Sequence, residues 1–235
     1  MIKLDKANTK RILREYAGKY ELYNDFSATV RRLLLLFCRS ENINFHSIIY
    51  RPKEIYNLKQ KIKRKALVNR IYQNLDEISD LAGVRVVLYF KSDVAKVVEI
   101  INKEFIVHQA DNVDKPSLDK QTGYSSIHRV VSISKERQLL KEYCHFVNLK
   151  CEVQIRTILQ NAWAEIEHGI GYKPSFIAKG VVGKKLRKIF QTTAKQLAKA
   201  DENFSKIEEI HNQSLACCRK KIEQRELNIP INLNL

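Results

Sequence analysis

The alternation of apolar and polar positions in residues 149–156 is the clearest local pattern along the chain. One set of side chains is polar and the other apolar: Glu152, Gln154 and Arg156 against Cys151, Val153 and Ile155. Successive side chains of a strand point to opposite faces, so this pattern predicts a half-buried strand. A helix is predicted directly after it, from 158 to about 169. An acid, an amide and a guanidinium would then share one face of a sheet.

The other predicted elements follow from the same periodicities. The β-branched run GVRVVLYF at 83–90 predicts a second strand. Further strands are predicted at 45–50, 104–109 and 126–133. Helices are predicted at 3–22, 26–40 and 93–103, with another opening at Pro52, where a first helical turn tolerates proline, and running to about 64. Residues 110–123 are predicted to be a polar loop.

Beyond Gly183 the apolar residues keep helical spacing, which is typical of core packing. These residues are Leu186, Phe190, Leu197, Phe204, Ile207 and Leu215. Together the elements predict an α+β fold, a mixed sheet of roughly five strands flanked by helices and extended by helices at both ends. We expect N-terminal helices at 1–44, a core at 45–175 and a helical extension at 176–235, packed as one unit.

The charge balance changes this picture most. Lys and Arg total 42 against 26 acidic residues, a net charge of +16, and a polyanionic partner is a physical reason to tolerate such self-repulsion. A solvated lysine-rich surface is the plainer alternative. The five cysteines show no metal-ligand spacing, the N-terminus shows no leader-like apolar stretch, and LLLLFC is too short to span a bilayer. We therefore expect a cytoplasmic protein with reduced thiols and no membrane association.

A cationic segment follows the strand predicted at 45–50. Residues 51–70 hold eight basic side chains against Glu54 alone: Arg51, Lys53, Lys59, Lys61, Lys63, Arg64, Lys65 and Arg70. Basic side chains beside a helix start can bind an anion. An exposed basic face explains the same composition equally well.

Two carboxylates could converge across the predicted sheet. Asp80 precedes the strand at 83–90, and Glu152 lies on the polar face described above. Mg²⁺ is commonly held by one or two carboxylates together with substrate phosphates, although Asp80 could also be an ordinary cap or turn residue.

Tyr124 stands at a loop-to-strand junction, where it could stack on a base or simply cap the core.

Four segments together resemble the RelA/SpoT synthetase domain, in the same order and at similar spacing. They are RPKEIYNLKQK, DLAGVRVV, TGYSSIH and EVQIRT followed by W and EHGIGYK, within about residues 45–175. The resemblance implies a nucleotidyltransferase-like sheet and an ATP pyrophosphokinase, which transfers pyrophosphate from ATP to a ribose 3′-OH and releases AMP. The chain is similar to the small, single-domain members of the family.

The resemblance also implies roles for individual residues. Arg51, Lys53 and Lys61 match positions that bind ATP phosphates. Asp80 and Glu152 match the catalytic Mg²⁺-binding acids, with Glu152 also orienting or activating the 3′-OH. Tyr124 matches the aromatic that stacks on the acceptor base and His128 an acceptor contact, while Gln154 and Arg156 complete the wall of the site.

Two positions depart from the family pattern. Asn57 replaces a frequent serine and keeps a polar side chain. Ser125 stands where alarmone synthetases often carry Arg or Gln, and the missing cation weakens the expectation that a free nucleotide's 5′-phosphates are recognised.

The acceptor can be interpreted in two ways. The high positive charge and Ser125 favour the 3′ end of tRNA, as in a toxic subgroup whose members would need a neutralising antitoxin, with Lys63, Arg64 and Lys65 binding the tRNA backbone. GDP or GTP, giving an alarmone of the (p)ppGpp type, is the alternative. A catalytically inactive RNA-binding module is a third hypothesis, which the paired carboxylates disfavour because plain binding needs no acids in a phosphate site.

Overall fold

A mixed six-stranded sheet is the centre of the computed structural model, which describes residues 6–115, 126–171 and 181–223. Its strands are β1 (Phe45–Pro52), β2 (Ala82–Leu88), β3 (Phe105–Val107), β4 (Val113–Lys115), β5 (Ser126–Ile133) and β6 (Cys151–Thr157). The order is β1-β2-β6-β5-β3, and β4 pairs with β5. The central β2–β6 pair is parallel and the other pairs are antiparallel. The predicted α+β class and mixed sheet are confirmed; β4, with three residues, is too short to stand out in the sequence.

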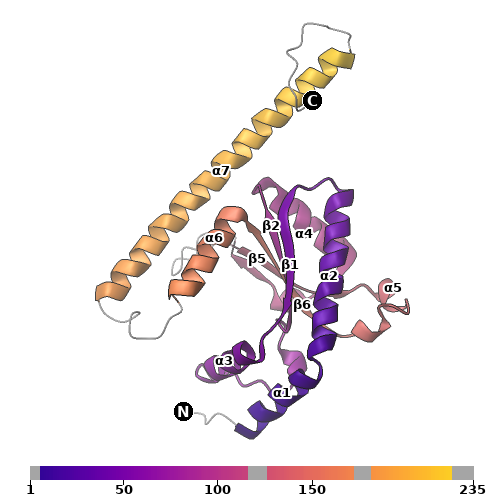
Figure 1. The fold of residues 1–235 in the computed structure, drawn as a ribbon, viewed down its shortest axis with the longest axis vertical. Coiled ribbons are helices and arrows are strands. Elements are labelled where there is room, and N and C mark those ends of the chain that lie inside the picture. The colour runs from indigo at the N-terminus through magenta and orange to yellow at the C-terminus, as the bar shows by residue number, and fades with distance from the viewer. Residues whose placement is uncertain (1–5, 116–125, 172–180, 224–235) are drawn as a thin grey trace.

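Seven α-helices surround the sheet within the described residues. They are α1 (Lys6–Gly18), α2 (Tyr20–Ser40), α3 (Ile55–Ala66), α4 (Ser92–Glu104), α5 (Lys135–Gln138), α6 (Ile158–Ile166) and α7 (Val181–Glu223). Helices α2 and α4 lie on one side of the sheet, α6 lies on the other, and α1 and α3 lie near the ends of β1 and β6 (Figure 1). One face of the sheet is therefore a packed core, and the opposite face is covered in part by α6.

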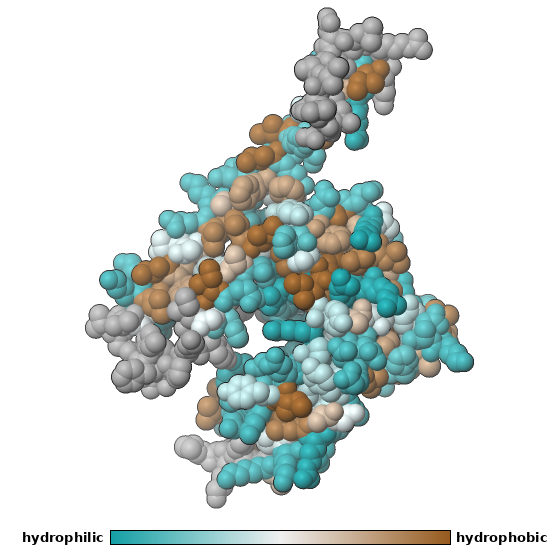
Figure 2. All heavy atoms as spheres, viewed as in Figure 1, coloured by the Kyte–Doolittle hydropathy of each residue, from teal (hydrophilic) through white to brown (hydrophobic). Residues whose placement is uncertain are grey.

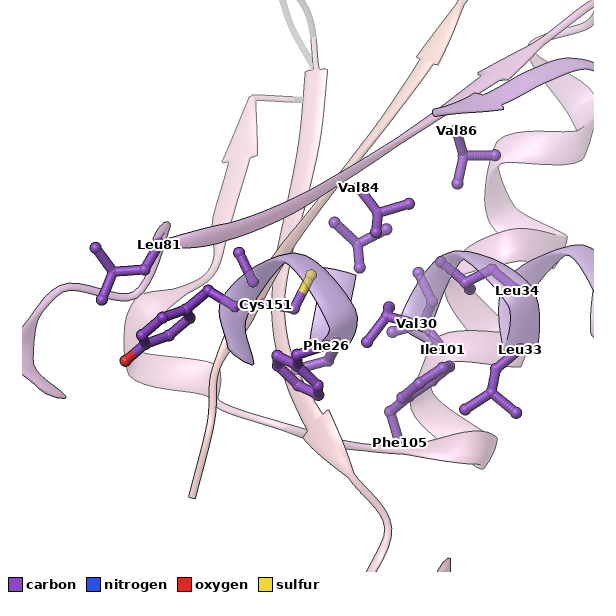
Figure 3. Close-up of a cluster of buried hydrophobic side chains, with 14 of the residues drawn as sticks. Phe26, Val30, Leu33, Leu34, Leu81, Val84, Val86, Ile101, Phe105 and Cys151 are labelled. Atoms are coloured by element: carbon purple, nitrogen blue, oxygen red, sulfur yellow. The ribbon is translucent and has the colours of Figure 1, made fainter. Parts of the chain in front are cut away.

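The core lies between the sheet and α2 and α4. Alternate residues of β2 and β6 point into it, and side chains of α2 pack over them (Figure 3). The fully or nearly fully buried set includes Phe26, Val30, Leu34, Val84, Val86, Ile101, Cys151, Val153 and Ile155. This alternation sends the other residues of the same strands, including Glu152 and Gln154, to the opposite face.

The first two helices meet earlier than predicted. The sequence predicts a break between 22 and 26, whereas α1 ends at Gly18 and α2 begins at Tyr20. Glycine is the weakest helix former apart from proline, so it explains the break where it occurs. The ring of Tyr16 contacts those of Tyr20 and Tyr23, with centroids 5.9 and 5.5 Å apart, and these contacts bridge the two helices.

The prediction that Pro52 opens a helix is wrong. Pro52 is the last residue of β1, where it pairs with Ala82, and α3 begins three residues later at Ile55. β1 is an edge strand of the sheet, and a proline is tolerated at an edge because its missing N–H removes no essential ladder hydrogen bond. Residues 53–54 therefore form a short connection between strand and helix.

Helix α7 docks on the sheet side that carries α6. Trp163 of α6 donates a hydrogen bond to the Phe190 carbonyl at 3.2 Å, and the two rings meet edge to face. The buried Asp201 accepts one from the Thr157 hydroxyl at 2.7 Å. The predicted core role of the α7 stripe is only partly right, because Phe204 and Ile207 are 46% and 60% exposed. Helix α7 continues well past the body of the protein (Figure 1).

No helix within the described ranges is both long enough and apolar enough to cross a bilayer. The division of the chain into ranges 1–44, 45–175 and 176–235 stays a prediction.

Candidate active site

The candidate site lies on the face of the sheet opposite α2 and α4. Gly83 pairs with Arg51 on one side and with Glu152 on the other, so these three residues form one row across β1, β2 and β6. In the next row Gln154 pairs with His128 of β5. Paired residues of a sheet share a face, so the register alone brings four of the predicted site residues together.

Gly83 leaves the floor of the first row open. A Cβ at this position would lie 3.4 Å from the Arg51 carbonyl oxygen and 4.0 Å from that of Glu152, which is ordinary contact. A single methyl would fit, but a larger side chain would rise between Arg51 and Glu152. The glycine therefore keeps space free above the sheet for a ligand.

A chain of polar contacts runs along the site face of β5 and β6. The Ser126 hydroxyl lies 2.7 Å from His128 Nε2, and His128 Nδ1 lies 3.2 Å from Glu152 Oε1. The Gln154 amide donates to Glu152 Oε2 at 2.7 Å, and the Arg156 guanidinium donates to Gln154 Oε1 at 2.8 Å. Both carboxylate oxygens of Glu152 are therefore held by neighbours that are fixed on the sheet.

These contacts keep Glu152 ionised. Burial alone would raise its pKa, but the hydrogen bond and charge of His128, the amide of Gln154 and the charge of Lys53 together lower the pKa to about 2. Its side chain remains 22% exposed, so the carboxylate is still reachable from the open face. At neutral pH it is an anion that can accept hydrogen bonds or bind a cation.

Asp80 is the second carboxylate, and its partners are lysines. Its backbone lies in a turn just before β2, as the plainer interpretation allowed. Its side chain contacts the ammonium groups of Lys53 at 2.8 Å and Lys61 at 2.7 Å. All three side chains are less than a fifth exposed, so the ion pairs are only weakly screened. The turn, the end of β1 and helix α3 thus converge on one acid.

Lys53 links the two carboxylates. Its ammonium contacts Asp80, and its charge also contributes to lowering the pKa of Glu152. The two acids and two of the cations predicted for ATP phosphates, Lys53 and Lys61, therefore form one connected cluster. Asn57, near the start of α3, donates to Glu54 at 3.1 Å.

The cluster suits a hard divalent cation only with help from a ligand. Asp80 and Glu152 offer carboxylate oxygens, the donors that Mg²⁺ prefers. The Asp80 Oδ1 atom is buried and accepts no properly directed hydrogen bond, although the Lys61 ammonium is near. In the described part of the chain no three His, Cys, Asp or Glu side chains gather as a ready metal site. The two acids fit Mg²⁺ if further oxygens come from substrate phosphates.

Tyr16 is a site residue that the sequence did not reveal. Its hydroxyl donates to the Lys53 carbonyl at 2.5 Å and lies 3.3 Å from that of Leu81, which ties α1 to both sides of the turn. Burial raises the pKa of Tyr16, so the hydroxyl stays protonated and remains a donor. In the sequence Tyr16 looks like any apolar helix position, and only the fold brings it to residues 53 and 81.

Arg85 was also missed. It lies in the second row, paired with Gln154, and so shares the site face. Its guanidinium forms an ion pair with Glu165 near the end of α6. This contact links the sheet to the helix that follows β6, and nothing in the sequence indicates it because the partners are 80 residues apart.

The remaining predicted residues occupy different places. Lys63, Arg64 and Lys65 lie in the last turn of α3, where positive charge also favours the helix dipole. Lys63 and Arg64 are exposed and Lys65 is half-buried. Tyr124 and Ser125 lie outside the described residues.

Figure 2 shows a hollow between the part of the surface that contains α3 and the part that contains the sheet, lined in this view mostly by hydrophilic residues.

Comparisons with known proteins agree with this geometry. Residues 50–176 match the region found in RelA / SpoT proteins. The GTP pyrophosphokinase YjbM of Bacillus subtilis is 30% identical over 179 residues, which cover 73% of this chain and 76% of that protein. The GTP pyrophosphokinase YwaC of the same organism is 32% identical over 126 residues, covering 52% and 56%.

A solved structure gives the same result at the level of the fold. The small alarmone synthetase 1 from Bacillus subtilis superposes with a TM-score of 0.65 at 25% identity, covering 85% of this chain and 97% of that one. The matched range includes both carboxylates, both lysines and the polar strand that connects them. The chain therefore belongs to the RelA/SpoT family and is a pyrophosphokinase of that kind.

Proposed function

We propose that this enzyme uses Mg²⁺ and transfers the β- and γ-phosphates of ATP, as pyrophosphate, to the ribose 3′-OH of a guanosine nucleotide. The observation that carries the proposal is the linked pair of carboxylates: Asp80 between two lysines and the ionised Glu152 beside it, joined through Lys53. Phosphoryl transfer depends mainly on positioning and on neutralising charge, and this cluster contains the groups for both.

Arg51, Lys53 and Lys61 are the proposed ligands of the ATP phosphates. Arg51 is exposed near the end of β1, in the row of Gly83 and Glu152, and the two lysines contact Asp80. Ammonium and guanidinium groups from three adjoining elements can reach different oxygens of one triphosphate.

Asp80 and Glu152 are the proposed Mg²⁺ ligands. Their carboxylates are hard oxygen donors, and two acids suffice where substrate phosphates complete the coordination. When bound, the ion would neutralise negative charge on the phosphates during transfer. The contacts of the cluster fix both acids relative to β2 and β6, so phosphates bound by the neighbouring cations would meet the acceptor hydroxyl at a defined place.

Glu152 would orient the attacking hydroxyl more than it would deprotonate it. A carboxylate with a pKa of about 2 is a weak base, but it accepts a hydrogen bond well. In the transfer the 3′-oxygen forms a bond to the β-phosphorus, and the bond from that phosphorus to the α–β bridging oxygen breaks. AMP leaves with the bridging oxygen, and the hydroxyl proton passes finally to solvent.

A guanosine nucleotide is the acceptor that the relatives support. The two curated relatives named above are both GTP pyrophosphokinases. His128, Gln154 and Arg156 extend from Glu152 along the sheet and could contact the acceptor's ribose and phosphates. Tyr124 remains our candidate for stacking on its base.

The 3′ end of tRNA is the second candidate. The +16 charge and the exposed end of α3, with Lys63 and Arg64, favour it. A broad basic surface can neutralise many backbone phosphates of an RNA, which raises the affinity for it. In that case Lys63, Arg64 and Lys65 would contact the tRNA backbone, and a cell would need a neutralising antitoxin.

Labelled ATP tests both acceptors directly. ATP carrying label in the γ-phosphate is incubated with the protein and either GDP, GTP or bulk tRNA, and the labelled product is identified. Label on GDP or GTP supports the first candidate, and label on tRNA the second. No transfer to any of the three would contradict the proposal.

A charge-reversal variant then separates a tRNA surface from a solvated one. Replacing Lys63, Arg64 and Lys65 by Glu should raise the KM for tRNA and flatten its salt dependence, since each lost contact removes about 0.9 of a unit from the slope. The KM for ATP and GTP should stay unchanged. An unaltered salt slope for tRNA would leave these residues without a role in acceptor binding.

A further inference from the structure

The two carboxylates of the site differ in what holds them. Glu152 is held by His128 and Gln154, side chains fixed on neighbouring positions of the sheet. Asp80 is held by two ammonium groups, one on each oxygen: Lys53 on Oδ2 and Lys61 on Oδ1. A divalent cation would have to approach the same two oxygens.

Electrostatics opposes that approach in the nucleotide-free protein. A cation entering at Asp80 meets two positive charges at contact distance from its intended ligand. Since the lysine side chains are only 15% and 19% exposed, water screens this repulsion poorly. The acid is therefore neutralised, and more than neutralised, before any metal arrives.

A bound triphosphate can compete with Asp80 for the two ammonium groups and so remove their repulsion of a metal ion. The ammonium group of lysine is a compact charge on a flexible four-carbon stem, so it can turn from one anion to another without moving the backbone. The Lys53 main chain is fixed, its N–H donating to the Leu81 carbonyl at 2.8 Å while its own carbonyl accepts from Tyr16. Only the side chain needs to leave Asp80.

We propose that Lys53 and Lys61 shield Asp80 from divalent cations until ATP phosphates draw the two ammonium groups away. The inference rests on the proposed function of the site and adds an order to its assembly. The nucleotide, alone or carrying its own ion, must bind before Asp80 can act as a metal ligand. The same lysines thus keep an empty enzyme from holding a metal ion unproductively.

The geometry of the contact between Lys61 and Asp80 supports this role for Lys61 in particular. The Lys61 ammonium lies 2.7 Å from Asp80 Oδ1, yet that buried atom accepts no properly directed hydrogen bond. The contact is therefore an ion pair without the geometry of a directed hydrogen bond, so it does not require one orientation of the ammonium group. The ammonium is also 6.0 Å from the centre of the Tyr72 ring.

Manganese binding to the nucleotide-free full chain tests the shield without any turnover. The electron paramagnetic resonance signal of free Mn²⁺ is followed as protein is titrated in, for wild type, Lys61→Met and Lys63→Met. Lys63 is the matched control, since it is an exposed lysine two positions along the same helix. We expect Lys61→Met to bind Mn²⁺ about tenfold more tightly than wild type, within the usual range of coupling between sites, and Lys63→Met to match wild type.

A second substitution assigns the gain to Asp80. Adding Asp80→Asn to Lys61→Met should remove the extra affinity completely, whereas Asp80→Asn alone should leave Mn²⁺ binding at the wild-type level. Circular dichroism checks that each variant is folded, and Lys53→Met repeats the test if Lys61→Met is not.

Two results would overturn the shield. One is equal Mn²⁺ affinity in Lys61→Met and Lys63→Met; the other is tight, Asp80-dependent binding already in the wild type. Neither would contradict the proposed function, which is measured separately by transfer of label from ATP. Conversely, a wild type that transfers no label would contradict the function whatever the Mn²⁺ titration gives.

Discussion

The two carboxylates of the site have different kinds of partners, and each carboxylate with its partners is one half of the site. The sheet half is Glu152 with His128 and Gln154, and the lysine half is Asp80 with Lys53 and Lys61. Glu152 stands near the start of β6, between β2 and β5, and its partners His128 and Gln154 are set by sheet register. Asp80 stands in a turn, and its partners are long side chains from a strand end and a helix. The sheet half is arranged before any ligand arrives, while the lysine half can rearrange around one. Preorganisation suits the role proposed for Glu152 in orienting the acceptor, and exchangeable partners suit the role proposed for Asp80 beside the charged donor.

The largest effect is expected from the preorganised half. Glu152→Gln should lower the rate of pyrophosphate transfer by about two to three orders of magnitude, as for the loss of one preorganised charge-stabilising group. Binding of a non-hydrolysable ATP analogue should change little, since the phosphate cations are untouched. Steady-state kinetics and calorimetry measure the two quantities. Glu99→Gln, on the exposed side of α4, is the control and should behave as wild type.

A smaller effect is expected from the lysine half. Lys61→Met should weaken binding of the ATP analogue by about tenfold, because a charge-assisted contact contributes about 1.5–3 kcal/mol. Lys63→Met should leave it unchanged. Isothermal titration calorimetry gives both values. If the two variants lose affinity equally, general positive charge and not the position of Lys61 holds the phosphates.

Both halves could be anticipated from the sequence to different degrees. The alternation around Glu152 predicted the strand, its open face and the neighbours Gln154 and Arg156, because a strand's period of two is a local property. The contact of Asp80 with Lys53 and Lys61 was not predictable in detail. Sequence separation gives no indication of which lysine meets which acid, and the connection at 53–54 was itself mistaken for part of a helix.

The supports of the site were the least predictable part. Tyr16 reaches the Lys53 carbonyl from α1, and Arg85 pairs with Glu165 across the open face. Each contact joins residues that are distant in sequence and ordinary in type. The fold class follows from periodicity, but such contacts depend on how whole elements pack, which no short pattern records.

Tyr16 offers a test of how the lysine half is supported. Tyr16→Phe removes the hydroxyl that donates to the Lys53 carbonyl, leaving a partly buried acceptor unpaired. The free energy of unfolding should fall by about 1–2 kcal/mol, with a modest rise in the KM for ATP and little change in kcat. Chemical denaturation and kinetics measure these. Tyr20→Phe is the matched control, and an equal loss of stability there would deny Tyr16 a specific role.

The smallest effect concerns the contact between α7 and the end of β6. Burial raises the pKa of Asp201, and the Thr157 hydrogen bond and the Lys91 charge offset this only in part. The folded protein therefore binds this proton more tightly than the unfolded chain. The contribution of protonated Asp201 to the free energy of unfolding is fully present at low pH and declines as pH rises through the folded-state pKa.

Asp201→Asn should remove this dependence. Relative to wild type, the variant should gain free energy of unfolding as pH rises above about 4, the ordinary pKa of an aspartate, because asparagine can still accept from Thr157 without being ionised. Denaturant unfolding across that range measures the difference. Glu209→Gln, at an exposed position of the same helix, is the control, and a pH-independent difference for Asp201→Asn would contradict the assignment.

The most direct test of the central claim is phosphorus NMR of the wild-type reaction with ATP, Mg²⁺ and GTP. If pyrophosphate is transferred at the Asp80–Glu152 site, AMP should appear at the rate at which a 3′-pyrophosphorylated guanosine nucleotide forms, with one AMP for each product. Glu152→Gln and Asp80→Asn should each lower the rates of appearance of both signals together, by about two to three orders of magnitude for Glu152→Gln. Release of ADP or inorganic phosphate in place of AMP, or product formation that survives both substitutions, would contradict the account.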